Sequence, residues 1–294
     1  PSAMKYMEIA PAVAHARHMP THIFIQHGMW DLVSNHNQRA YDAARDLWTP
    51  GDSVGDTVHP LDWGQYGDLQ LGDYDKARTW INRIEMVADE SDGQERAVNS
   101  ISLLKARYVV ETEDWKVEPI TETSSAPELL ATGLSAIELN DLETAKAAET
   151  KLAEEAADGS ATVKISHKEL SAAIKAHEGD GDTAISLMDE AIEIALGQRL
   201  PNGAANPIKP PYELYGEILM GLGRSKDALE KFEASLLRMP KRTHSLLGAA
   251  EAAAASGDRG AAKEHYATLL EFWQGSSRLP GIEEAKRFTT DGQE

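Results

Sequence analysis

Histidines gather near the start of this chain. Six of its ten histidines lie within the first fifty-nine residues, and four of these fall between His15 and His27. Imidazole is the commonest metal ligand in proteins and the only side chain that titrates unperturbed near neutral pH. This cluster is therefore the strongest chemical signal in the sequence.

Two stretches place histidines at matching positions of successive predicted helices. Pro20 suits the first turn of a helix, which puts His18 just before that helix and His22 in its first turn. His59, with Asp62 three residues later, repeats this arrangement at the predicted start of a second helix. Equivalent positions of stacked helical repeats lie about 10 Å apart. These side chains are therefore predicted to converge along one edge of the stack.

Three imidazoles, with or without a carboxylate, would suit zinc, copper, nickel or iron. We predict a metal site at His18, His22 and His59, with Asp62 and His15 as further candidate ligands. The alternatives are a polar cluster that contacts a ligand and a purely structural role, because buried polar groups are commonly just hydrogen-bonded. The remaining histidines are expected to face elsewhere or to lie on the surface and between helices: His27, His36, His167, His177, His244 and His265.

Helical hairpins must position these residues. Alanine, leucine and glutamate dominate, and aromatic residues make up only 6% of the chain, which favours helix. One unit recurs: an apolar helix, a short Gly/Asn/Asp turn and an alanine-rich helix. Gly223 and Gly257 mark two such turns 34 positions apart, the period of the tetratricopeptide repeat (TPR). We predict an all-α, TPR-like α-α superhelix, a solenoid of about six to seven helical hairpins in a single domain over residues 1–294.

Three segments interrupt the predicted array. They are Thr49–Pro60, Val117–Pro127 and Gly197–Pro211, each rich in proline, glycine or polar residues. Long loops in a compact array are often functional. None has the composition of a flexible interdomain linker, which supports one continuous domain.

The first histidine segment carries a resemblance to a family. His15-Ala-Arg-His18-Met-Pro-Thr-His22-Ile-Phe resembles the motif His-Ala-x-His-Met-Pro-Ser/Thr-His-Ile-Phe of an uncharacterised bacterial family of TPR proteins. Blocks at 59–70, 207–217 and 240–248 also look like this family. Its members usually carry an upstream block, His-Pro-Gly-x-x-His-Tyr-x-x-His, so the resemblance implies that an N-terminal segment is missing. It also implies a periplasmic or exported protein, without a particular activity. Tyr212 stands where the family often has histidine.

A second candidate site lies in the C-terminal part of the chain. Glu213 and Glu217 are one helical turn apart and share a face. Paired carboxylates can bind metal or perform acid–base chemistry, but glutamates more commonly form a solvated face. If the fifth repeat curves toward the first, this pair would share a concave site with the histidines. Trp63 is a candidate ligand contact, although packing is the more usual role of such aromatics.

Composition excludes several function classes. The chain carries 29 Lys+Arg against 48 Asp+Glu, so nucleic acid and anionic membrane surfaces are poor partners. It has no cysteine, which excludes disulfides and thiolate sites. No apolar stretch is long enough to span a membrane, and no phosphate loop or hydrolase motif occurs.

Two functions remain after these exclusions. The leading hypothesis is a helical-repeat scaffold that presents a concave surface to a protein, peptide or small ligand. The alternative is a metalloprotein, either metal-binding or a metal-dependent enzyme, with zinc or copper at the histidine cluster. The sequence does not say whether the protein is an enzyme.

Overall fold

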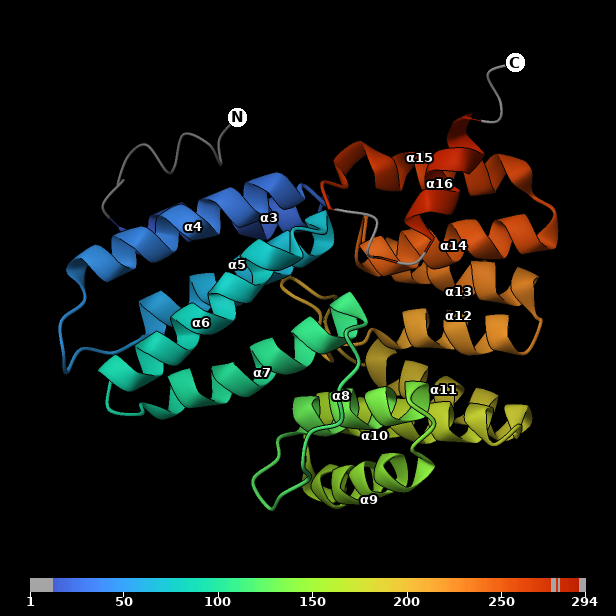
Figure 1. The fold of residues 1–294 in the computed structure, drawn as a ribbon, viewed down its shortest axis with the longest axis horizontal. Coiled ribbons are helices and arrows are strands. Elements are labelled where there is room, and N and C mark those ends of the chain that lie inside the picture. Colours follow the sequence, from blue (N-terminus) through green and yellow to red (C-terminus); the bar gives the residue numbers. More distant parts are fainter. Residues whose placement is uncertain (1–12, 276–278, 280, 291–294) are drawn as a thin grey trace.

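The protein is described by a computed structural model that places residues 13–275, 279 and 281–290. Every regular element within that part of the chain is an α-helix. Successive helices pack side by side along the chain, as Figure 1 shows. This confirms the predicted all-α, TPR-like array. None of the helices in the described residues is both long enough and apolar enough to cross a membrane.

The helices follow one another with few interruptions. In chain order they are α2 (Ala14–His18), α3 (Thr21–Ile25), α4 (Trp30–Leu47), α5 (Gly55–Leu71), α6 (Tyr74–Glu90), α7 (Glu95–Thr112), α8 (Ala126–Glu138), α9 (Leu142–Asp158), α10 (Ala161–His177), α11 (Gly181–Leu196), α12 (Pro211–Gly221), α13 (Ser225–Arg238), α14 (Thr243–Ser256), α15 (Arg259–Phe272) and α16 (Ile282–Thr290). The predicted loops at 117–127 and 197–211 are irregular over most of their length.

A recurring turn joins the two helices of most hairpins. At Gly72 the backbone is left-handed, with φ 75°, and the next residue, Asp73, accepts a hydrogen bond from the backbone N–H of Lys76. A left-handed residue ends the first helix, and an aspartate then caps the second. The same pair recurs at three later turns: Asn140–Asp141, Gly179–Asp180 and Gly257–Asp258. The repeat is thus encoded by local chemistry at each turn.

The second half of the predicted loop at 49–60 is helical instead. Helix α5 begins at Gly55 and runs through Pro60. Proline near the start of a helix removes only one backbone hydrogen bond, so the helix tolerates it. His59 therefore lies in the second turn of α5 rather than at its start. Similarly, Pro20 is the N-cap of α3, and His18 is the last residue of the separate short helix α2.

The array curves until its C-terminal helices contact the N-terminal ones (Figure 1). The indole N–H of Trp30 donates to the carbonyl of Lys241 at 2.8 Å, and the hydroxyl of Thr243 donates to the carbonyl of Gln70 at 2.7 Å. The backbone N–H of Gln274 donates to the carbonyl of Leu71 at 2.8 Å. These bonds join α4 and α5 to segments some 170 to 210 residues later in the chain. The two ends of the described array are thus joined directly.

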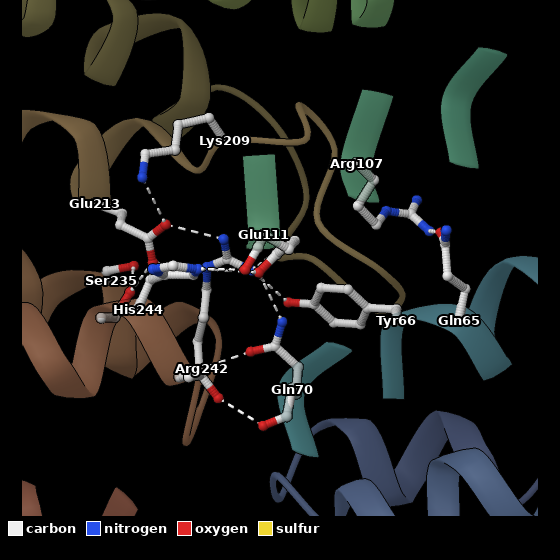
Figure 2. A network of polar contacts seen from close by, with 12 residues as sticks. Gln65, Tyr66, Gln70, Arg107, Glu111, Lys209, Glu213, Ser235, Arg242 and His244 are labelled. Atoms are coloured by element: carbon white, nitrogen blue, oxygen red, sulfur yellow. Dashed lines mark hydrogen bonds and ion pairs between the residues drawn. The ribbon is translucent and has the colours of Figure 1, made fainter. Parts of the chain in front are cut away.

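A buried ionic group, which we call the seam cluster, holds this junction. It consists of Arg242, Glu213, Glu111 and Tyr66 (Figure 2). Arg242 Nε and Nη2 donate to the two carboxylate oxygens of Glu213 at 2.7 and 2.9 Å. Its Nη1 donates to Glu111 Oε1 at 2.7 Å and to the Tyr66 hydroxyl at 3.1 Å. One guanidinium therefore ties together α5, α7 and α12.

Candidate metal centre

Three histidines from three helices meet where α2 and α3 pack beside α5. One ring nitrogen from each of His18, His22 and His59 lies within 4.8 Å of the others, and we call this group the histidine triad. The Nε2 atoms of His18 and His22 are 3.3 Å apart. The rings of His18 and His59 have centroids 4.3 Å apart. The structure therefore brings together the three histidines that were predicted as the main metal ligands.

The polar contacts of His18 fix its protonation pattern. Its Nδ1 lies 2.7 Å from Asn37 Oδ1, and the amide nitrogen of Asn37 donates to the carbonyl of Val33 at 2.8 Å. Because the Asn37 oxygen can only accept, His18 Nδ1 must carry the proton. The neutral ring then has a lone pair on Nε2, the atom that faces His22. The sequence alone predicted no role for Asn37.

All three imidazoles favour the neutral form. Burial lowers the pKa of His18 to about 4; the bond to Asn37 opposes this shift, while His59 and His22 add to it. Burial also lowers the pKa of His22, against a hydrogen bond to the backbone of Asn202. Burial lowers the pKa of His59 as well, although the Asp62 carboxylate opposes the effect. Neutral imidazole is the form that binds metal ions.

Trp63 packs against the whole triad. Its ring centroid lies 4.8 Å from that of His18, 4.5 Å from that of His22 and 5.7 Å from that of His59. The indole is 4% exposed, so it restricts the rotation of the imidazoles and shields them from water on one side. Trp63 and His59 are four residues apart on α5, which places them on one face of that helix.

The two further candidate ligands lie outside the triad. Asp62 Oδ1 accepts from Arg107 Nη1 at 2.6 Å, so an ion pair already engages this carboxylate. His15 is exposed at the surface of α2, close enough to influence the pKa of all three triad histidines. His27 and His36 also lie outside the triad. His244 is buried between helices, where its Nε2 donates a hydrogen bond to the backbone carbonyl of Glu111. Ligation by His15 or Asp62 stays a prediction.

A cavity of about 690 Å³ opens beside the triad. His22, His59, Asp62 and Trp63 line it, and the segment 198–211 supplies much of the opposite wall. That segment is anchored to the histidine region: the Gln26 side-chain amide donates to the carbonyl of Pro201 at 2.7 Å. The long loop singled out in the sequence is therefore part of the same site.

Glu213 and Glu217 occupy a different environment from the predicted solvated face. The Glu213 side chain is fully buried in the seam cluster, and only Glu217 is partly exposed. Lys209 lies between them, 3.3 Å from Glu213 Oε1 and 2.5 Å from Glu217 Oε1. Burial raises the pKa of Glu213, but Arg242 and Lys209 outweigh this and hold it well below its ordinary value. The expectation of a solvated pair is wrong for Glu213, because Arg242 from a later segment and Lys209, four residues earlier in the chain, neutralise it.

Comparison with known proteins gives structural neighbours only. No protein-family model matches the chain, and no curated protein sequence matches it. The fold is similar to the crystal structure of a tetratricopeptide repeat protein from Parabacteroides merdae. The match covers 94% of this chain and 97% of that chain, with 12% sequence identity and a TM-score of 0.48. The match to the TPR domain of P58(IPK) covers 100% of this chain and 84% of that chain, with 15% sequence identity and a TM-score of 0.35.

Proposed function

We propose that this protein binds a transition metal ion, zinc or copper, through His18, His22 and His59, and that the metal takes part in binding a small ligand in the adjoining cavity. The observation that carries the proposal is the approach of three neutral imidazoles, from three different helices, to within 4.8 Å of one another. Three histidines plus one open position form a common arrangement for functional zinc sites.

The spacing of the first two ligands fits a tetrahedral metal ion. Zinc–nitrogen bonds of about 2 Å place two ligand nitrogens about 3.3 Å apart. The Nε2 atoms of His18 and His22 have this separation. His59 is half-buried at the cavity wall, and metal binding would require its ring nitrogen, which lies within 4.8 Å of those of His18 and His22, to move closer to them.

The surroundings of the triad also support a metal site. Metal-bound histidines commonly donate their second ring N–H to a carbonyl or carboxylate, which fixes the ring and raises its basicity. Here Asn37 takes that role for His18, and the backbone of Asn202 does so for His22. Because His22 and His59 line the cavity, the fourth coordination position would face it.

Metal analysis of untagged protein tests the proposal. After the protein is stripped with a chelator and dialysed, we expect it to take up one equivalent of Zn²⁺ or Co²⁺, with the intense visible absorption of tetrahedral Co²⁺. His22→Ala and His59→Ala should each abolish this absorption and weaken metal binding at least tenfold, because each removes a ligand.

His27→Ala is the matched control, since His27 is an exposed histidine of the same segment outside the triad. It should bind metal like the parent protein. Uptake below about one-tenth equivalent, or equal loss in the His27→Ala control, would refute the metal site.

A protein- or peptide-binding scaffold is the second candidate function. The helical-repeat array favours it, together with the exposed leucines Leu196, Leu200 and Leu237. Leu196 and Leu237 lie at helix ends that touch, because Arg238 donates to the carbonyl of Ala195. Loss of partner capture in Leu237→Ser, with unchanged metal uptake, would favour this function.

A further inference from the structure

We propose that the cavity beside the histidine triad binds a small organic acid, whose carboxylate is held by Arg107, Arg199 and Arg238 and whose apolar body lies against the cavity wall. This inference names the ligand class of the proposed function and rests on the same cavity. Its evidence is the charge and the chemistry of the lining, which are independent of any metal ion.

The cavity lining has the opposite charge balance from the chain as a whole. The protein has a formal net charge of −19, yet three arginines and a single carboxylate, Asp62, line the cavity. Asp62 is paired with Arg107, which leaves Arg199 and Arg238 as excess positive charge. In the described part of the chain neither of these two arginines forms an ion pair. A concave, partly desolvated pocket that concentrates positive charge attracts anions.

The three arginines retain hydrogen-bonding capacity. Arg107 is 1% exposed, and its Nε is buried without a partner among the described residues, although its Nη1 donates to Asp62. Arg238 uses one donor on the carbonyl of Ala195 at 3.2 Å, and Arg199 belongs to the part of the lining formed by residues 198–211. Guanidinium groups pair with carboxylates through two parallel hydrogen bonds.

The rest of the lining fits an apolar body. Trp63, Leu103, Ile165 and Met239 contribute apolar surface, and several prolines of the 198–211 segment add to it. A volume of about 690 Å³ lies within the range of pockets that enclose small organic molecules. A bare inorganic anion would leave most of this surface uncovered. An aryl or alkyl carboxylate would use both the arginines and the wall.

Benzoate and its neutral isostere benzamide test this inference by ligand-observed NMR titration. We expect benzoate to bind chelator-treated, metal-free protein at least about tenfold more tightly than benzamide, because a charge-assisted pair contributes more than a neutral contact. Zinc should tighten benzoate binding further. His22→Ala should remove that zinc-dependent gain, because it removes a metal ligand.

Two arginine variants locate the bound carboxylate. Arg238→Gln should weaken benzoate binding about tenfold, and Arg199→Gln by a smaller factor because Arg199 is exposed. Arg224→Gln is the matched control: Arg224 is an exposed arginine outside the cavity lining, paired with Asp227. Circular dichroism should show the same helix content in all three.

Each contrary result overturns the inference. Equal binding of benzoate and benzamide would mean a purely apolar pocket. Binding that requires zinc and ignores both arginine variants would mean that the metal alone holds the anion. No benzoate binding with or without zinc would also overturn the inference, and zinc uptake by the same sample would then show that the proposed metal site had not failed with it.

Discussion

The seam cluster is a buried group of charged side chains, whereas the histidine triad is a partly buried group of neutral ones. In the seam cluster, the Arg242 guanidinium lies between the carboxylates of Glu111 and Glu213. In the triad, three neutral imidazoles face one another, and a lone pair of His18 points at His22. The first group contains its own counter-charges. The second offers imidazole nitrogens with lone pairs, which can bind a metal ion.

This difference separates stability from function. Buried opposite charges lose hydration, and the hydrogen bonds between them offset this loss, so they need no further partner to be stable in the fold. Neutral imidazoles that meet through one long hydrogen bond gain little from folding alone, and a cation bound between them would add to their stabilisation. We therefore expect the seam cluster to govern folding stability and the triad to govern ligand response.

Replacing the seam arginine should have the largest effect. Arg242→Met leaves Glu111 buried without its arginine and leaves Glu213 with Lys209 alone, so we expect the free energy of unfolding in urea to fall by about 3–5 kcal/mol. Arg224→Met, which breaks an exposed pair with Asp227, should cost no more than about 1 kcal/mol. Similar losses in both variants would contradict the assigned role of the seam cluster.

Zinc should stabilise the protein through the triad alone. At a free zinc concentration of 100 times the dissociation constant, linkage predicts a gain of about 2.7 kcal/mol in the free energy of unfolding. His59→Ala should lose this gain, while its metal-free stability should change by less than about 1 kcal/mol. Thermal denaturation with and without zinc measures both. If His59→Ala lost most of its metal-free stability but kept the gain from zinc, the triad would be a structural group and not the zinc site.

Two glycines test how closely the array is joined. Gly72 and Gly223 both have positive φ, but a Cβ at Gly72 would lie 2.5 Å from the Trp273 ring, whereas one at Gly223 would meet nothing. Gly72→Ala should therefore cost about 1–3 kcal/mol more than Gly223→Ala in urea denaturation. Equal costs would mean that the C-terminal segment does not pack against this turn.

Two buried glutamates should give opposite pH dependences. Arg242 and Lys209 hold the pKa of Glu213 low despite burial, so its contribution to stability is present above the ordinary pKa of about 4.3 and is lost as the pH falls. Burial raises the pKa of Glu169 well above its ordinary value, so its contribution is lost as the pH rises. Relative to the parent, Glu169→Gln should gain stability from pH 5 to 8. Glu213→Gln should lose most near neutral pH, and parallel curves would refute the assignment.

Local sequence signals made the helical repeat predictable, but the contact between the N-terminal and C-terminal helices could not be predicted from them. Left-handed residues followed by aspartate mark the turns at Gly72 and Gly257 within a few residues of sequence. Repeat equivalence related His59 to His22, although helix α5 begins earlier than the loop-like composition of 49–60 suggested.

The seam and the cavity charge depend on distant contacts. Arg242 is separated by 131 residues from Glu111 and by 176 from Tyr66, and no local pattern identifies this pairing. For the same reason Glu213 was expected to be solvated, and no role was predicted for Arg107 or Arg238. Their roles follow only from how far the array curves.

X-ray absorption at the zinc edge of the one-to-one complex tests the central claim most directly. The account predicts three imidazole nitrogens at about 2.0–2.1 Å plus one oxygen ligand, and one imidazole fewer in His59→Ala. A shell made of oxygen ligands only, or an identical spectrum from His59→Ala, would contradict the histidine triad as the metal site.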